Sequence, residues 1–368
     1  MMDEPKYIQI KTDLQNKIKE EKFLLGARIP SETDLQKEYK VSRHTVRLAI
    51  NHLVNEGYVK KIQGSGTYVS NAYQSKKMYS NLNGQKTIAV VTTYLSDYIF
   101  PSIIRGIEDQ LSEYGYSLLL YSTKNKVENE RNALESMLEN KVDGLIIEPT
   151  KSNQMNPNLN YYLDLHDNQV PLIMLHAGYE ELDLPIISMD DVEAGRIATE
   201  YLIEKGHLNI GMITKSDDLQ GRNRFRGFLK ALYDAKLSFS SHSILRFDTE
   251  SKANLPILIR EMLTKGDLPS AFVSYNDEVA VVLIEELKKI GLNCPDDISI
   301  VSHDNSYFSD TLSAVKLTTI NHPKEKMGKK AAELVISSIE NRQPIQSYVF
   351  KPELVIRDSV LDLENEEE

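Results

Sequence analysis

The chain has 368 residues, of which 41% are hydrophobic and 26% are charged, and its formal net charge is -11. A chain of this length exceeds one ordinary core and indicates two or three domains, and the lack of any run of about 18 apolar residues excludes a transmembrane helix. The N-terminus has no apolar signal segment and the single cysteine, Cys294, excludes an internal disulfide, so we expect a cytoplasmic protein.

The charge is distributed unevenly along the chain. Residues 1–77 hold 14 Lys/Arg and 9 Asp/Glu, a net of +5, whereas the remaining residues have a net of -16. Phosphate contacts supply much of the affinity of proteins for DNA, so a local basic excess is typical of a DNA-binding region. The pattern favours a basic head on an acidic body.

The sequence of the head predicts three helices. An apolar period indicates the first helix over about 6–22. Ser31 followed by Asp34 is close to a capping box and predicts the start of a short second helix. Ser42 caps a third helix that extends to about residue 55. Two short capped helices separated by a short joint have the spacing of a helix-turn-helix.

The third helix carries the predicted DNA-reading face. Arg43, Arg47 and Asn51 share one side of it at i, i+4 and i+8. Arginine can donate two parallel hydrogen bonds to guanine, so both arginines are predicted base or phosphate contacts, with a solvated helix face as the alternative. Glu32 suits either a cytosine contact or the helix dipole. The other candidates for DNA contact are Lys6, Ser31, His44, Thr45, Gln63, Gly64 and Gly66.

A wing and then a linker follow the helices. Gly64 and Gly66 permit a tight hairpin between two short strands, and together they predict a winged helix-turn-helix. Residues 71–85 are polar with almost no aliphatic side chains and predict a linker.

From residue 86 onward, apolar strands alternate with amphipathic helices. This alternation predicts an α/β body of parallel sheets with helices on both faces, and ligands would bind at the carboxyl ends of the strands. The number of units exceeds one open sheet, so we expect two similar lobes. The expected extents are 1–70 for the head, 71–85 for the linker, 86–362 for the body, about 86–186 and 318–345 for lobe 1, and about 187–317 and 346–360 for lobe 2.

Two known families resemble this chain. Residues 5–70 resemble the head of the gluconate-repressor (GntR) family in "IPSETDLQKEYKVSRHTVRLAINHLVNEGYV" and "GSGTYV". Residues 86–360 resemble the sugar-binding body of the lactose/galactose-repressor family, itself similar to periplasmic sugar-binding proteins, in "PSIIRGIEDQLSEYGYSLLL", "EKGHLNIGMI", "RFRGF", "YNDEVA" and "ISIVSHDN". The pairing of this head with this body is similar to the arabinose repressors of Bacillus-like bacteria. The resemblance implies a homodimeric repressor that binds double-stranded operator DNA and is released by L-arabinose.

The resemblance also implies a sugar pocket. Arg224 matches the arginine of "R-x-x-G-F", which binds sugar hydroxyls in the family and whose planar donors suit vicinal hydroxyls, with an exposed helix arginine as the alternative. Asn276, Asp277 and Asp304 follow predicted strands and are expected to accept hydrogen bonds from a polyol. Further candidates, with core packing or helix capping as alternatives, are Tyr98, Phe100, Glu148 and Asp190.

The sequence holds no Walker motif, nucleophile elbow or metal-ligand cluster, so we expect no enzymatic activity, cofactor or metal. The rival predictions are a regulator of the same architecture that responds to another sugar, an enzyme with an aminotransferase-like body behind a regulatory head, and a plain sugar-binding protein. In the favoured mechanism, sugar bridges the two lobes and stabilises a closed form whose heads are spaced unsuitably for the operator.

Overall fold

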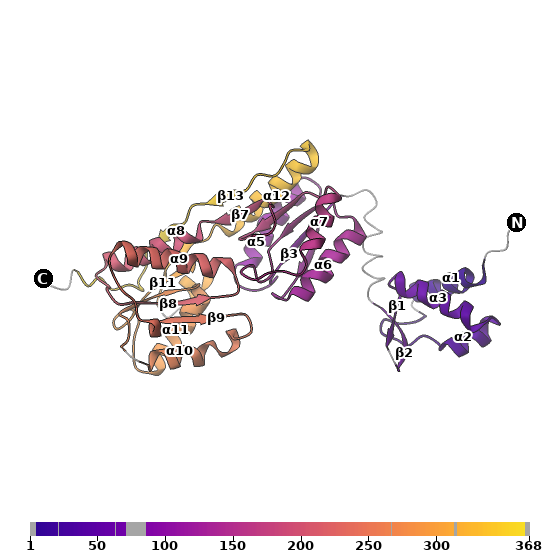
Figure 1. Ribbon diagram of the computed structural model, residues 1–368, viewed down its shortest axis with the longest axis horizontal. Coiled ribbons are helices and arrows are strands. Elements are labelled where there is room, and N and C mark those ends of the chain that lie inside the picture. Colours follow the sequence, from indigo (N-terminus) through magenta and orange to yellow (C-terminus); the bar gives the residue numbers. More distant parts are fainter. Residues whose placement is uncertain are drawn as a thin grey trace. The chain divides into compact units, whose positions relative to one another are not determined.

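The computed structural model describes residues 5–20, 22–62, 64–70, 86–265, 267–312 and 315–364 (Figure 1). The chain divides into two compact units, Met1–Gly84 and Gln85–Glu368, and each is described by itself. The predicted linker over 71–85 lies outside the described residues. Within the described ranges, every helix is too short or too polar to cross a bilayer.

The head contains three helices and a two-stranded wing. The elements are α1 (Lys6–Lys19), α2 (Glu32–Tyr39), α3 (Arg43–Asn55), β1 (Val59–Ile62) and β2 (Gly66–Val69). The two strands pair antiparallel, with Val59 opposite Val69. All three helices and both strands contribute to one core, whose members include Ile10, Leu14, Ile18, Leu35, Val46, Ile50, Leu53, Val59 and Val69.

The helix boundaries in the head follow local capping and burial. Ser31 forms the predicted capping box with Asp34, and Ser42 caps α3. The first helix ends at Lys19 rather than near residue 22, and the last residue of its buried stripe is Ile18.

The described residues of the body form two six-stranded sheets. The first has the order β13-β7-β6-β5-β3-β4 and is parallel. The second has the order β14-β12-β11-β10-β8-β9, and β14 is antiparallel to β12. The strands are β3 (Thr87–Thr92), β4 (Ser117–Ser122), β5 (Gly144–Ile147), β6 (Leu172–Leu175), β7 (Ile186–Met189), β8 (Ile210–Lys215), β9 (Ile244–Phe247), β10 (Ala271–Ser274), β11 (Ser299–Asp304), β12 (Thr318–Asn321), β13 (Tyr348–Phe350) and β14 (Glu353–Val355).

Helices cover both faces of each sheet, as expected for buried parallel strands. In lobe 1, α5 and α12 pack on one face and α6 and α7 on the other. In lobe 2, α8 and α9 pack on one face and α10 and α11 on the other. The helices are α5 (Phe100–Glu113), α6 (Val127–Asn140), α7 (Leu159–Asp167), α8 (Asp191–Glu204), α9 (Leu219–Asp234), α10 (Leu255–Leu263), α11 (Asp277–Lys289) and α12 (Lys324–Asn341).

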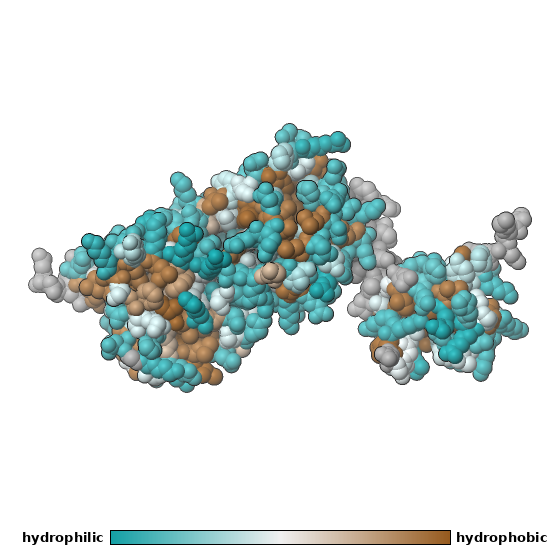
Figure 2. Space-filling model, in the orientation of Figure 1, coloured by the Kyte–Doolittle hydropathy of each residue, from teal (hydrophilic) through white to brown (hydrophobic). Residues whose placement is uncertain are grey.

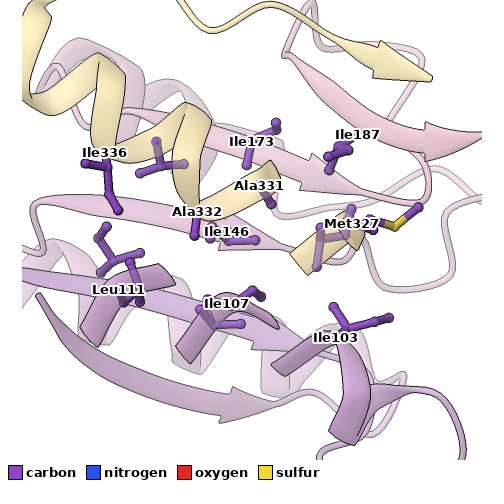
Figure 3. Packing of buried hydrophobic residues seen from close by; sticks show 14 of the residues in the cluster. Ile103, Ile107, Leu111, Ile146, Ile173, Ile187, Met327, Ala331, Ala332 and Ile336 are labelled. Carbon is purple, nitrogen blue, oxygen red and sulfur yellow. The ribbon is translucent and has the colours of Figure 1, made fainter. Parts of the chain in front are cut away.

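Both lobes use glycine to bring one pair of helices into close contact. Figure 3 shows side chains of α5, such as Ile107, and of α12, such as Ala332, packed together with strand residues such as Ile146 of lobe 1. A Cβ on Gly106 would lie 2.2 Å from Glu325 O, and one on Gly328 would lie 2.1 Å from Ile103 O. In lobe 2, a Cβ on Gly195 of α8 would lie 2.1 Å from Arg224 O. The same packing solution in both lobes agrees with the expectation of two similar lobes.

The chain crosses between the lobes after β7, after β12 and after β13. These crossings correct the expected lobe limits. Lobe 1 continues through Met189 and includes β13, whereas β12 belongs to the sheet of lobe 2. The expected limits were wrong because membership of a sheet depends on which strand a segment pairs with, and hydrophobic patterning does not specify that partner.

Candidate functional site

The predicted DNA-reading face of α3 is exposed. Arg43, His44 and Arg47 lie at the surface, and Thr45 is half-buried. The Arg43 side chain is 70% exposed, and its Nε donates a hydrogen bond to Glu32 Oε2 at 3.2 Å. Glu32 therefore orients the Arg43 guanidinium, whose remaining N–H groups suit bidentate binding to a guanine edge.

Ser31, the one serine predicted to contact DNA, acts as a helix cap, and so does Ser42. Ser31 Oγ accepts from Asp34 N at 3.2 Å, and Ser42 Oγ accepts from Thr45 N at 3.2 Å. The Ser42 and Thr45 hydroxyl oxygens are 2.8 Å apart. Because the first backbone amides of a helix bind phosphate, Ser31 and the capped start of α2 stay predicted contacts to the DNA backbone.

The wing needs glycine at two positions for different reasons. Gly64 has φ +75°, which favours glycine whatever the surrounding space. Gly66 has φ +139°, and a Cβ there would lie 2.6 Å from Arg28 Nε. Gln63, predicted at the wing tip, lies outside the described residues.

Two lysines add positive charge to the surface of the head. Lys6 is the exposed first residue of α1. Lys61 of β1 donates to Asn51 Oδ1 at 2.9 Å, so the wing and α3 are joined by their polar side chains. These cations suit DNA phosphates, as the basic composition of the head predicts.

The body encloses a cavity of about 650 Å³ between its lobes. Its walls come from loops at the carboxyl ends of strands in both sheets, the position expected for a ligand in α/β folds. Six of the predicted ligand-binding residues line it: Tyr98, Phe100, Glu148, Arg224, Asn276 and Asp304.

Arg224 of α9 forms the charged centre of the lobe 2 wall. Its Nε donates to Asp191 Oδ1 at 2.8 Å, its Nη1 to Tyr275 O at 2.7 Å and its Nη2 to Asp304 Oδ1 at 3.2 Å. Burial alone would raise the pKa of Asp304, but the Arg224 charge lowers that pKa overall. Both terminal nitrogens keep a further N–H for a ligand hydroxyl.

Tyr98 of lobe 1 reaches across to lobe 2. Its hydroxyl donates to Asp304 Oδ2 at 2.8 Å and accepts from Asp277 N at 3.2 Å. Burial and the Asp304 charge raise the pKa of Tyr98 well above its ordinary value, so the phenol stays protonated. Phe308 packs beside it with ring centroids 5.8 Å apart.

Glu148 supplies a carboxylate from lobe 1. Its Oε2 accepts from Thr93 N at 2.8 Å and from Thr93 Oγ1 at 2.6 Å. Its Oε1 lies 3.0 Å from Nδ1 of the buried His176. Both oxygens are thereby fixed at the cavity wall, where they also suit donation from a ligand hydroxyl.

Further residues of the cavity were missed from the sequence. Lys215 at the end of β8 binds Asp218 at 2.9 Å, and Tyr275 Oη donates to Asp218 Oδ2 at 2.7 Å. Burial alone would lower the pKa of Lys215, but the neighbouring carboxylates raise it overall. The available signal was their position directly after apolar strands.

A polar seam joins the lobes beside the cavity. Asn125 Nδ2 donates to Thr249 Oγ1 at 2.5 Å and to Asp217 Oδ2 at 3.3 Å. Lys151 of lobe 1 binds Glu250 of lobe 2 at 2.5 Å. The seam consists of contacts between distant segments, so local patterning gave no signal for it.

Two predicted ligand residues are corrected because they lie outside the cavity wall. Asp190 is exposed and caps α8 by accepting from Glu193 N at 2.9 Å. Asp277 is buried behind the wall, where Oδ2 accepts from Ser306 N at 2.6 Å and Oδ1 from Thr319 Oγ1 at 2.7 Å. The buried Asp191, adjacent to Asp190, is the residue that contacts Arg224.

His303, which directly precedes Asp304, is buried and lies outside the cavity wall. Its Nδ1 lies 2.9 Å from Ser274 O, and burial lowers its pKa to about 3. The ring is therefore a neutral part of the core of lobe 2.

The cavity offers charge-fixed donors and acceptors beside aromatic rings, an arrangement that suits a ligand with several hydroxyl groups. Within the described ranges, no group of three or more His, Cys, Asp or Glu residues is arranged to hold a metal ion.

Comparisons with known proteins agree with this division of the chain. The bacterial regulatory protein gntR family matches residues 6–69, and a periplasmic binding protein-like domain matches residues 199–360. The arabinose metabolism transcriptional repressor of Geobacillus stearothermophilus is 44% identical over 364 residues, covering 98% of this chain and 98% of that protein. The predicted winged head is confirmed by the first of these matches.

Solved structures resemble the body. The transcription regulator CcpA of Lactococcus lactis has a TM-score of 0.66 and 25% identity, covering 75% of this chain and 99% of that chain. The lac repressor dimer bound to operator and an anti-inducer has a TM-score of 0.66 and 21% identity, covering 77% of this chain and 98% of that chain. The predicted two-lobed fold of the body is confirmed.

Proposed function

The chain belongs to the family of arabinose metabolism transcriptional repressors, and from that premise we propose that it represses genes for arabinose uptake and catabolism. A homodimer binds operator DNA through its heads in the cytoplasm, and L-arabinose in the body cavity releases it. The named relative is a transcriptional repressor, which favours this function over the enzyme alternative.

The observation that carries the proposal is the charge of the cavity wall, where each cation is paired with a carboxylate and the carboxylates outnumber the cations. Each lysine or arginine of the cavity wall is matched by a carboxylate: Lys215 by Asp218, Arg224 by Asp191 and Asp304, and Lys252 by Glu278. An anionic ligand would have to compete with these carboxylates. A neutral ligand rich in hydroxyl groups can instead donate to the acids and accept from the cations.

The same geometry supports release by linkage. Tyr98 and the polar seam connect the lobes around the cavity, so a sugar held there contacts both lobes at once. Sugar then stabilises the arrangement in which these contacts form, and operator affinity changes by the difference in sugar affinity between the two arrangements.

Exposed apolar side chains on the body support the homodimer. Figure 2 shows hydrophobic patches on an otherwise hydrophilic face of the body. Ile257 on α10 is 57% exposed and Ile290 after α11 is 38% exposed. Exposed apolar surface is typical of association surfaces, and a dimer would present two heads to a two-fold operator.

Two measurements test the function. Among a panel of pentoses and hexoses, only the effector should raise the melting temperature of the protein, because a ligand that binds the folded state stabilises it. The same sugar should release the protein from operator DNA in a binding titration. Release by another sugar but not by L-arabinose would assign a different effector, and no response to any sugar would contradict the proposal.

A further inference from the structure

Two buried histidines lie behind the cavity, outside its wall. His176 follows β6 of lobe 1, and His322 lies in the crossing between β12 of lobe 2 and α12 of lobe 1. Their exposed fractions are 6% and 3%, and their ring centroids are 5.1 Å apart in an edge-on arrangement. A ring of lobe 1 thus rests against a segment that connects the two lobes.

His176 is connected to the sugar cavity through Glu148. Its Nδ1 lies 3.0 Å from Glu148 Oε1, and its backbone N–H donates to Ile187 O at 2.8 Å. The residue has φ +65°, a left-handed conformation that is uncommon for residues other than glycine and that histidine adopts more often than most. Conformations of this kind persist where the surroundings hold them, and they occur often at functional sites.

His322 is connected to the opposite wall of the cavity through Asp304. Its backbone N–H donates to Asp304 O at 3.4 Å, and Lys324 Nζ donates to Asp304 O at 2.6 Å and to His322 O at 3.2 Å. Asp304 itself has φ +96° and holds Arg224 with its side chain. A continuous series of contacts therefore passes behind the cavity from Glu148 to Asp304.

The environment of the His322 ring is unusual for a purely structural side chain. Burial lowers its pKa well below the ordinary value, with further contributions from His176 and Lys324, so the ring is neutral. Neither ring nitrogen has a hydrogen-bond partner among the described residues. A buried polar group without a partner costs free energy, so stability alone favours an apolar ring at this position.

We propose that the His176–His322 ring contact is the positioning element that couples occupancy of the sugar cavity to the crossing between the lobes. This inference rests on the proposed function. Movement of the crossing displaces the His322 ring, and that displacement is transmitted through His176 to Glu148. By reciprocity, a sugar that binds Glu148 stabilises one conformation of the crossing.

The test measures the coupling factor, which is the ratio of operator Kd with saturating L-arabinose to operator Kd without sugar. The full-length His322→Ala protein should bind operator normally without sugar, and its coupling factor should fall by about 2- to 30-fold. His322→Phe keeps an aromatic ring and removes the unpaired nitrogens. It should retain the wild-type coupling factor and have a higher melting temperature.

A second variant tests the other side of the contact. His176→Asn tolerates the left-handed backbone and keeps an N–H for Glu148, but it removes the ring. Its coupling factor should fall as in His322→Ala, and the double variant should show no further fall. His207→Ala is the control, because His207 is buried between Ser270 and Leu361 in lobe 2; it should change stability and leave the coupling factor unchanged.

The outcomes separate this inference from the proposed function. Normal coupling in both His322→Ala and His176→Asn, with sugar release of the wild type intact, overturns only the inference. Failure of the wild type to respond to any sugar overturns both. If His322→Ala does not fold, the coupling factor of His176→Asn decides, and a wild-type value there overturns the inference. A coupling factor that falls in His322→Phe as it does in His322→Ala would also contradict the proposal, because the aromatic ring is kept in that variant.

Discussion

The head and the body hold their functional arginines in opposite environments. Arg43 of the head is 70% exposed and contacts Glu32 of its own chain. Arg224 of the body is 3% exposed and contacts two carboxylates and a backbone carbonyl. The Arg43 guanidinium is available to a partner outside the chain. The Arg224 guanidinium instead holds in place the carboxylates of the cavity wall that a ligand would contact.

This difference determines what a substitution measures. Removing an exposed arginine deletes a contact to the partner and leaves the fold intact, so the substitution lowers the binding affinity. Removing a buried arginine leaves charged groups without a partner, so its effect belongs first to folding. The predictions below test this contrast, beginning with the largest expected effect.

Arg224→Ala should destabilise the body by about 3–5 kcal/mol, because Asp191 and Asp304 would stay buried without their common cation. The free energy of unfolding is measured by chemical denaturation of the full chain, with a spectroscopic signal that reports the unfolding of the body. Arg222→Ala is the matched control on the same helix, since the Arg222 side chain is 58% exposed and should contribute less than about 1 kcal/mol. Equal unfolding free energies for the two variants would contradict the contrast.

Arg43→Ala should weaken operator binding by about 1–3 kcal/mol with unchanged stability of the head, if the guanidinium contacts a guanine. Lys61→Ala should weaken binding to all sequences alike and reduce the salt dependence. Titrations with operator and scrambled duplexes at several salt concentrations separate these effects. An equal loss on both duplexes for Arg43→Ala would identify a phosphate contact instead.

Asp277 provides a pH test of the buried body. Burial, followed by the Asp304 charge, raises the pKa of Asp277 from 3.8 to about 6 in the folded chain. Between the ordinary pKa of 3.8 and the folded pKa of about 6, the folded chain binds a proton at Asp277 that the unfolded chain does not. This group therefore raises the free energy of unfolding as pH falls from about 7 toward about 4. Between about pH 7.5 and 5, the wild type should gain about 1–2 kcal/mol of unfolding free energy relative to Asp277→Asn. A constant difference between the two proteins would contradict the raised pKa.

The parts of the fold that depend on local chemistry were predictable from the sequence. The starts of α2 and α3 were found because Ser31 and Ser42 satisfy backbone amides within their own turn. The alternating strands and helices of the body were also found from a local signal, which is the period of their apolar residues. The lobe limits were wrong at β12 and β13, because pairing with distant strands determines which sheet contains them.

The cavity was predictable where a single side chain carries a motif, follows a strand or, like Tyr98 and Phe100, offers an aromatic ring. Arg224 and Asp304 met that condition and line the cavity. Asp190 was predicted and its neighbour Asp191 was missed, because both suit the start of a helix and only the packed structure distinguishes the exposed cap from the buried ion pair. Asn125 was missed because its partners lie on the other lobe, far along the chain.

The smallest expected effect concerns Glu32, for which the sequence left two interpretations open. The structure brings its carboxylate to Arg43, and an exposed ion pair of this kind contributes about 0.2–1 kcal/mol. If Glu32 acts by orienting Arg43, Glu32→Gln should reduce the preference for operator over scrambled DNA by that amount, and it should have no effect in an Arg43→Ala background. Comparing the ratio of the two Kd values also removes the uniform gain in affinity that follows from deleting a negative charge near DNA. A loss of preference that persists without Arg43 would show that Glu32 contacts a base by itself, and the head would then contain a second, independent reading residue.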